Sequence, residues 1–159
     1  MLGRYIGKGD FVSEEETEVA PYSSRDRPGF LLECEVGCLG EIVIYVRKFL
    51  EILGEGPAPR NPSIETRWYS YHVYIRNWRS VFRYDNEDPE YMRGGHQDEH
   101  HKHVYDLKTG DEVSGSPKWI GADNWPHFHE VIEEAKKWYW GNHKLLPNPE
   151  AFPQLGVKG

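Results

Sequence analysis

The sequence predicts an α+β fold, in which a meandering antiparallel β-sheet carries a C-terminal α-helix packed on one of its faces. Two observations predict it. Between residues 31 and 107, short runs of alternating apolar and polar residues are separated by turns rich in Gly, Pro, Asn and Asp, which is typical of consecutive antiparallel strands. Between residues 125 and 140, the apolar residues change to the spacing of an amphipathic helix. We expect about five to six strands in this sheet.

The chain has 159 residues, which is enough to bury one hydrophobic core. We therefore expect a single domain over residues 1–159. Residues 1–30 are polar and interrupted by Gly and Pro, and we interpret them as a solvated N-terminal arm. Residues 31–141 form the core of sheet and helix. Residues 142–159 form an irregular, proline-rich tail.

The first two predicted strands pair as a hairpin. Residues 31–36 alternate between apolar and acidic side chains, which indicates a strand with one face in water. Gly37 and Gly40 bracket a turn, and residues 41–53 form a longer strand with an almost continuous apolar face. The loop that follows, over residues 54–62, is rich in Pro and Gly.

Three further runs complete the predicted sheet. Residues 65–77 form an aromatic third strand, and residues 80–85 form a fourth strand in which Arg83 and Asp85 share a face. Residues 99–107 form a fifth strand, and a sixth, short strand lies around Val113. In the fifth strand, alternation separates two sets of side chains: His101, His103 and Tyr105 on one face, and His100, Lys102 and Val104 on the other.

The predicted helix covers residues 125–140. Asp123 or Asn124 supplies its N-cap, and Pro126 fits its first turn. Gly141 is placed to end it. Its apolar stripe, which we expect to face the sheet, consists of Phe128, Val131, Ile132, Ala135 and Trp138.

The composition restricts the class of protein. The formal net charge is −7, which argues against coating of nucleic acid by bulk electrostatics but leaves room for a local basic cleft that holds one RNA segment. Cys34 and Cys38 are interpreted as reduced thiols. The ten Tyr and six Trp suggest an aromatic-lined cleft or a partner surface, and they leave a homo-oligomer open. No signal peptide or membrane-length apolar stretch is present, so we expect a cytoplasmic protein without a membrane partner.

The chemistry is concentrated in residues 83–105, where four of the eight histidines lie within eight positions. Histidine suits proton transfer near neutral pH, a carboxylate can orient an imidazole, and a guanidinium can clamp a phosphate. These residue types fit metal-independent cleavage of a phosphodiester bond. The candidate catalytic residues are Arg83, Asp85, His100, His101, Lys102 and His103.

The same segment supports two other interpretations. Two histidines at positions i and i+2 of a strand can reach one ion, so zinc or another divalent first-row metal could be held by Asp85, His96, His101 and His103. Such a site would make the chain a metal-binding hydrolase or a metal-binding module. Alternatively, the cluster is an exposed polar loop, Arg83 and Asp85 are an ordinary surface pair, and the chain is a non-catalytic interaction protein.

The segment from Tyr71 to Tyr105 resembles the TumE-type toxins of prokaryotic toxin–antitoxin modules. The residues that carry the resemblance are an aromatic strand ending at Arg76, the RYDN run at 83–86, a loop with His96, and the HHKH run at 100–103. The resemblance implies a small cytoplasmic toxin that is neutralised by a cognate antitoxin, which is often a DNA-binding protein.

Together, the resemblance and the chemistry predict a toxin that inhibits growth as a ribonuclease of the mRNA-interferase kind, with no cofactor. RNA is then a second partner beside the antitoxin. The residues that we assign to substrate binding lie on the aromatic strand and in the RYDN run: Tyr71, His72, Arg76, Tyr84 and Asn86.

Overall fold

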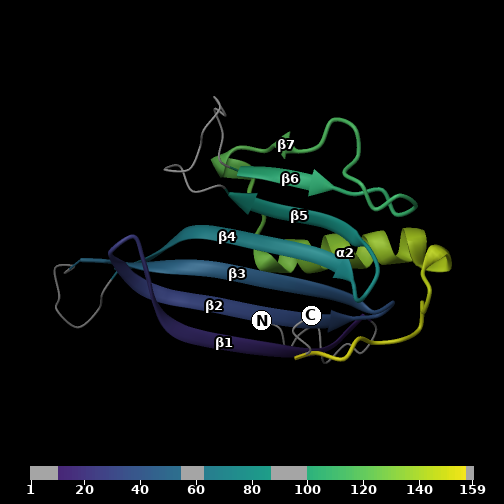
Figure 1. Ribbon diagram of the computed structural model, residues 1–159, viewed down its shortest axis with the longest axis horizontal. Helices are drawn as coiled ribbons and strands as arrows, with labels where there is room; N and C mark the ends of the chain where they lie inside the picture. The colour runs from purple at the N-terminus through teal and green to yellow at the C-terminus, as the bar shows by residue number, and fades with distance from the viewer. Residues whose placement is uncertain (1–10, 55–62, 87–99, 157–159) are drawn as a thin grey trace.

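The computed structural model describes residues 11–54, 63–86 and 100–156. Seven strands form one sheet in the order of the sequence, and every neighbouring pair is antiparallel (Figure 1). The predicted α+β class is confirmed, with more strands than expected. The strands are β1 (Val12–Ser24), β2 (Arg27–Cys38), β3 (Ile42–Leu53), β4 (Ser63–Ile75), β5 (Ser80–Asn86), β6 (His100–Val104) and β7 (Lys118–Trp119).

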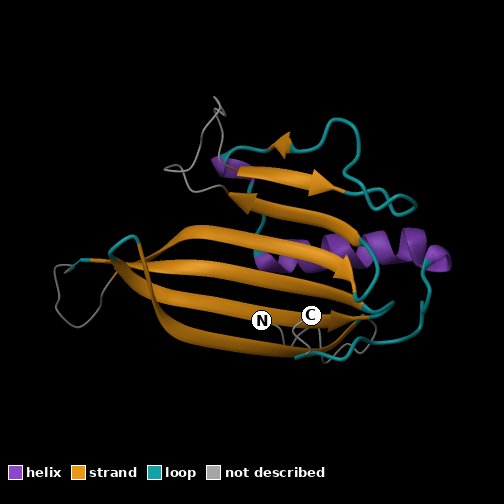
Figure 2. Cartoon of the chain, viewed as in Figure 1, coloured by secondary structure: helices purple, strands orange, loops and turns teal. Residues whose placement is uncertain are grey.

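One α-helix, α2 (Phe128–Asn142), lies against one face of this sheet (Figure 2). It is flanked by two short 3₁₀ helices, η2 (Ala122–Asn124) and η3 (His143–Leu145). We call the face that α2 covers the helix face and the opposite one the outer face. The helix buries Val131, Ile132, Ala135 and Tyr139 against the core strands. Within the described residues, no helix is long and apolar enough to cross a membrane.

The helix begins later than the sequence predicts. Pro126 disfavours helical backbone angles at the residue before it, and Trp125 is extended, with φ −69° and ψ 134°. The first turn therefore starts at Phe128, where the backbone N–H of His127 donates to Glu130 Oε2 at 2.6 Å. The predicted caps, Asp123 and Asn124, lie in η2 instead. At the other end, the helix continues through Gly141 to Asn142.

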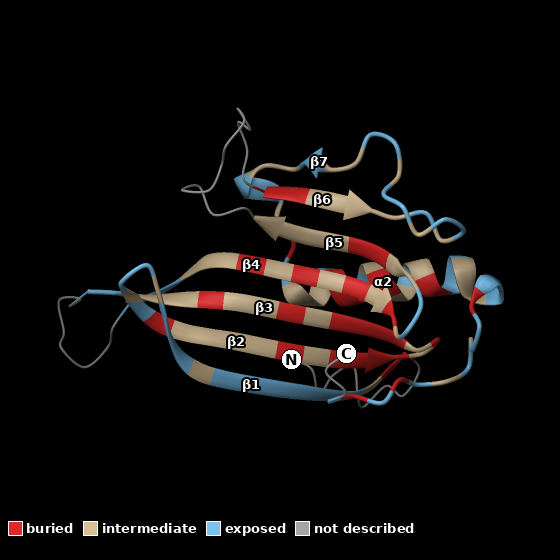
Figure 3. Ribbon diagram, in the orientation of Figure 1, coloured by how far each residue is buried: buried red, intermediate tan, exposed pale blue. Residues whose placement is uncertain are grey.

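The part of the predicted N-terminal arm that the structure describes, residues 11–30, is not a solvated arm, and residues 1–10 lie outside the described residues. Residues 12–24 form β1, which pairs with β2 along its length and forms the edge of the sheet. Most of its side chains are exposed (Figure 3), so it shows no apolar periodicity by which a strand could be recognised. The connection to β2 is a two-residue turn in which Arg25 and Asp26 have positive φ angles, 50° and 64°.

The C-terminal part of the sheet is shorter than predicted. Strand β6 ends at Val104, and Tyr105 makes only an isolated bridge to Glu112. The last strand is formed by Lys118–Trp119 rather than by residues around Val113. The core lies between the helix face and α2, and its fully buried side chains include Ile42, Ile44, Tyr71, Val73 and Ile132.

Candidate functional site

A cluster of charged and imidazole side chains lies on the outer face where β5 and β6 run side by side. The register pairs Arg83 with His103 and Asp85 with His101. Because alternate residues of a strand point to the same face, all four side chains project together. We call Arg83, Asp85, His101 and His103 the Asp85 cluster.

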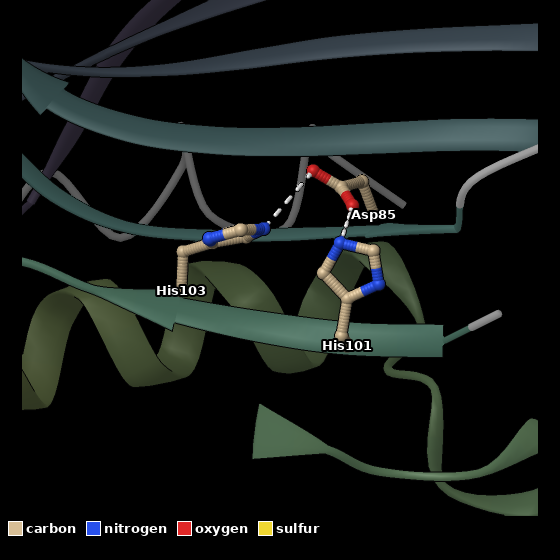
Figure 4. A group of neighbouring side chains, drawn as sticks. All are labelled: Asp85, His101 and His103. Carbon is tan, nitrogen blue, oxygen red and sulfur yellow. Dashed lines mark ion pairs between the residues drawn. The ribbon is translucent and has the colours of Figure 1, made fainter. Parts of the chain in front are cut away.

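Asp85 is the centre of this cluster (Figure 4). Its Oδ1 lies 2.5 Å from His101 Nε2, and its Oδ2 accepts a hydrogen bond from Arg83 Nε at 2.6 Å. The same Oδ2 lies 3.8 Å from His103 Nε2. The His101 side chain is only 2% exposed, and its ring packs edge-on against Trp119, with ring centroids 5.2 Å apart. A buried imidazole that is bonded to a carboxylate has a fixed orientation.

Burial of Asp85 tends to raise its pKa. The hydrogen bond and charge of His101 and the charge of Arg83 act in the opposite direction and outweigh burial, so the pKa of Asp85 lies below its ordinary value. The carboxylate is therefore ionised at neutral pH. It can orient His101 and balance a positive charge on that ring.

His103 is held between two side chains of opposite charge. Arg83 Nη2 lies 3.1 Å from His103 Nε2, and Glu112 Oε1 lies 2.5 Å from His103 Nδ1. A guanidinium only donates hydrogen bonds, so Nε2 accepts and the ring carries its proton on Nδ1. Ser116 Oγ donates to the same Glu112 oxygen at 2.7 Å, which fixes the carboxylate against the ring. His103 Nε2 is therefore available to a substrate group only after Arg83 moves.

A cavity of about 610 Å³ opens beside the cluster. The end of the β1–β2 hairpin folds over the sheet at this point (Figure 1), so that Tyr22 and Arg25 line the cavity together with Trp68, Asp85 and His101. The rings of Tyr22 and Trp68 both pack against Phe49, with centroids 5.7 Å and 6.0 Å from the centroid of its ring. The cavity thus combines aromatic rings with cationic side chains, as single-stranded nucleic acid sites do.

Two of the predicted catalytic residues do not reach this cluster. His100 and Lys102 project to the helix face, because they alternate with His101 and His103 along β6. His100 is buried, with its Nδ1 3.0 Å from Tyr69 Oη, and it stacks near Trp125. Lys102 forms an ion pair with Glu134 of α2. The structure therefore divides the HHKH run between the two faces of the sheet and brings only His101 and His103 to the Asp85 cluster.

Two of the predicted substrate-binding residues are also placed on the helix face. Tyr71 is fully buried and stacks on Phe128, with ring centroids 6.2 Å apart. Tyr84 donates from Oη to Glu134 Oε2 at 2.7 Å. Both hydroxyl groups point toward α2, so neither side chain can contact a substrate on the outer face.

The other predicted substrate contacts stay near the outer face. His72 lies beside Arg83 in the register and bonds through Nε2 to Ser80 Oγ at 2.9 Å. Asn86 lines the cavity, but both ends of its amide bond the β4 backbone. Arg76 follows directly after the end of β4, and its Nη2 lies 3.5 Å from Glu35 Oε1. His96 falls outside the described residues.

The predicted metal ligands are only partly assembled. One ligand atom each from Asp85, His101 and His103 lies within 4.8 Å of the others, which is a set of two histidines and one carboxylate. However, Arg83 donates hydrogen bonds to Asp85 Oδ2 and to His103 Nε2. A metal ion would need the lone pair of His103 Nε2 that Arg83 occupies, so Arg83 would have to move before the three residues could bind the ion.

Comparison with known proteins gives one match. The family model described as Toxin TumE matches residues 4–139, which include all seven strands and most of α2. The chain belongs to the TumE toxin family. It is therefore the toxin of a toxin–antitoxin module, and a cognate antitoxin is its partner. No curated protein and no solved structure matches the chain.

Several residues at the candidate site of this TumE toxin are not evident from the sequence. Glu112 reaches His103 from a turn, and Trp119 reaches His101 from the last strand. Tyr22 and Arg25 come from the β1–β2 hairpin, whose polar sequence predicts a solvated arm. Arg25 and Asp26 have positive φ angles, but neither residue is a glycine. The sequence therefore lacks the usual signal of a two-residue hairpin turn at this point.

Proposed function

We propose that this toxin inhibits growth by cleaving RNA, and that the Asp85 cluster performs the cleavage by acid–base chemistry without a metal ion. One observation carries the proposal: two imidazoles, a carboxylate and a guanidinium project together from β5 and β6, with Asp85 bonded to both His101 and Arg83. Cleavage through the 2′-hydroxyl needs a base, an acid and a cation that stabilises the charged transition state. The cluster contains each of these groups.

The contacts favour a particular division of roles. Asp85 holds His101 through Nε2, which positions that ring for proton transfer. The His103 ring lies beside it, with the two ring centroids 4.8 Å apart, so the imidazoles can act as a base and acid pair. The Arg83 side chain is 34% exposed and faces the cavity, where a phosphate can draw the guanidinium away from His103. That movement would free His103 Nε2 to accept a proton.

The position of Arg83 also supports the metal-independent form of the proposal. The Arg83 guanidinium already donates to two of the three available ligand groups, and its positive charge repels a divalent ion. The same guanidinium can supply the positive charge that a metal supplies in other phosphodiesterases.

The proposal is tested by expressing the toxin without its antitoxin and following growth and RNA integrity together. His101→Ala should restore growth and leave RNA intact, because it removes the ring that Asp85 orients. Asp85→Asn should act in the same direction, because the neutral amide does not support a charged ring. His129→Ala, on α2, is the matched control and should remain toxic.

This experiment distinguishes RNA cleavage by the Asp85 cluster from toxicity through binding alone. A His101→Ala protein that folds, accumulates and stays fully toxic contradicts the proposed chemistry and favours a toxin that acts by binding alone. Intact RNA during inhibition by the unaltered toxin would also contradict RNA cleavage.

A metal-dependent reaction is the second candidate, favoured by the convergence of ligand atoms from Asp85, His101 and His103 within 4.8 Å. Zinc or another divalent first-row ion would fit two imidazoles and a carboxylate. Protein purified without a histidine tag should contain less than one equivalent of metal if the metal-independent form is right. Stoichiometric metal that disappears in Asp85→Asn would establish the metal site instead.

A further inference from the structure

A second cavity lies on the same outer face as the Asp85 cluster, but near the β1 edge of the sheet. Its volume is about 820 Å³. We call it the acidic groove, because four glutamates of β1 and β2 line it: Glu16, Glu18, Glu33 and Glu35. Tyr45 and Tyr74 add aromatic surface, and Gly156 of the C-terminal tail borders the groove through a backbone hydrogen bond to Glu35 Oε2 at 3.0 Å.

The strand register places these carboxylates directly opposite one another. Glu16 pairs with Glu35, and Glu18 pairs with Glu33, in neighbouring antiparallel strands. Like charges at directly opposed positions destabilise a sheet, so this arrangement opposes folding of the isolated toxin. A cationic ligand that binds between the strands would remove that repulsion.

The positive charges near the groove are too few to neutralise it. Arg47 Nε lies 3.2 Å from Glu33, and Arg76 lies 3.5 Å from Glu35. Among the residues that the structure describes, Glu16 and Glu18 form no ion pair. The groove therefore keeps a net negative charge, which attracts a cationic partner and repels RNA.

The groove and the Asp85 cluster are the two ends of continuous rows of side chains across the sheet. One row runs from β1 to β6 through paired residues, in the order Glu18, Glu33, Arg47, Ser70, Asp85 and His101. Five strand spacings of about 4.8 Å make this row about 24 Å long. An extended segment of about seven residues, at about 3.3 Å each, would span it.

We propose that the acidic groove binds a Lys- and Arg-rich segment of the cognate antitoxin, and that this segment continues along the rows to cover the Asp85 cluster. Cationic side chains can pair with Glu16 and Glu18, and their aliphatic stems can pack on Tyr45 and Tyr74. The antitoxin would then neutralise the toxin through this single interface, because a segment anchored in the acidic groove also blocks the cavity beside His101. This inference depends on membership of the toxin family and not on RNA cleavage.

The test is a titration of the purified toxin with the purified antitoxin encoded beside it. The variant is Glu16→Lys with Glu18→Lys, which reverses the charge of the β1 side of the groove. It should weaken binding at least tenfold, and the affinity of the unaltered pair should fall as salt is raised. The variant should fold as well as the unaltered toxin, because each lysine now opposes a glutamate.

The matched control is Glu133→Lys with Glu150→Lys, which changes the charge equally at exposed positions of α2 and the tail. It should bind the antitoxin with unchanged affinity. Unchanged affinity of the groove variant, or an equal loss in both variants, would overturn the assignment of the groove. In cells, the groove variant should remain toxic and resist the antitoxin. This outcome does not depend on how the toxin kills, so it can succeed or fail separately from the RNA proposal.

Discussion

His72 offers a quantitative test of the electrostatics of the outer face. Its side chain lies next to Arg83 in the register and is bonded to Ser80. Burial, and then the positive charge of Arg83, lower the pKa of His72 to about 4 from its ordinary 6.5. The folded state therefore takes up this proton at a lower pH than the unfolded state does. The contribution of neutral His72 to the free energy of unfolding is fully present above pH 6.5 and is lost as the pH falls toward 4.

The size of this loss follows from the two pKa values. At pH 5, a group with pKa 6.5 in the unfolded chain and about 4 in the folded one lowers the free energy of unfolding by about 2 kcal/mol. His72→Gln keeps a hydrogen-bonding group for Ser80 but cannot titrate. Urea denaturation at pH 7.5 and pH 5 should show that the unaltered toxin loses about 2 kcal/mol more than this variant.

The other titrating groups are common to both proteins and cancel in this comparison. If the free energy of unfolding depends on pH in the same way for the unaltered toxin and for His72→Gln, the reasoning is refuted. That result would mean that folding does not change the pKa of His72.

Three substitutions distinguish the two faces of the sheet. Lys102→Met should lower the free energy of unfolding by about 1 kcal/mol, because it breaks a partly buried ion pair with Glu134, but growth assays should find it as toxic as the unaltered chain. Tyr71→Phe should keep or raise the unfolding free energy by up to about 1 kcal/mol and also stay toxic, since within the described structure Tyr71 Oη is buried without a hydrogen-bond partner. Arg83→Lys should relieve growth inhibition at unchanged charge, because an ammonium cannot reproduce the two-sided contact with Asp85 and His103. Lost toxicity in either of the first two variants, or full toxicity in the third, would contradict these placements.

The sequence was sufficient to predict which side chains lie together in the Asp85 cluster. Alternation in two strands placed Arg83 with Asp85 and His101 with His103, and the antiparallel connection brought the two pairs together. The same alternation separated His100 and Lys102 from them. The HHKH run therefore does not act as one group of neighbouring side chains, because the strand period divides it between the two faces.

Other features could not be predicted because they depend on tertiary packing. Both faces of β4 carry aromatic residues, so its pattern does not reveal that α2 covers Tyr71 and leaves Trp68 beside the cavity. Strand β1 is an exposed edge, and its glutamates follow no apolar period. The contact of Glu112 with His103 requires the bridge from Tyr105 that closes the intervening turn.

The most direct test of the central claim is the reaction of the purified toxin with single-stranded RNA in the presence of a chelator. Acid–base cleavage through the 2′-hydroxyl should proceed without metal and leave 2′,3′-cyclic phosphate ends, and His101→Ala should abolish it. RNA that stays intact until a divalent metal is restored would contradict the metal-independent account. Cleavage by His101→Ala at the unaltered rate would contradict the assignment of the Asp85 cluster.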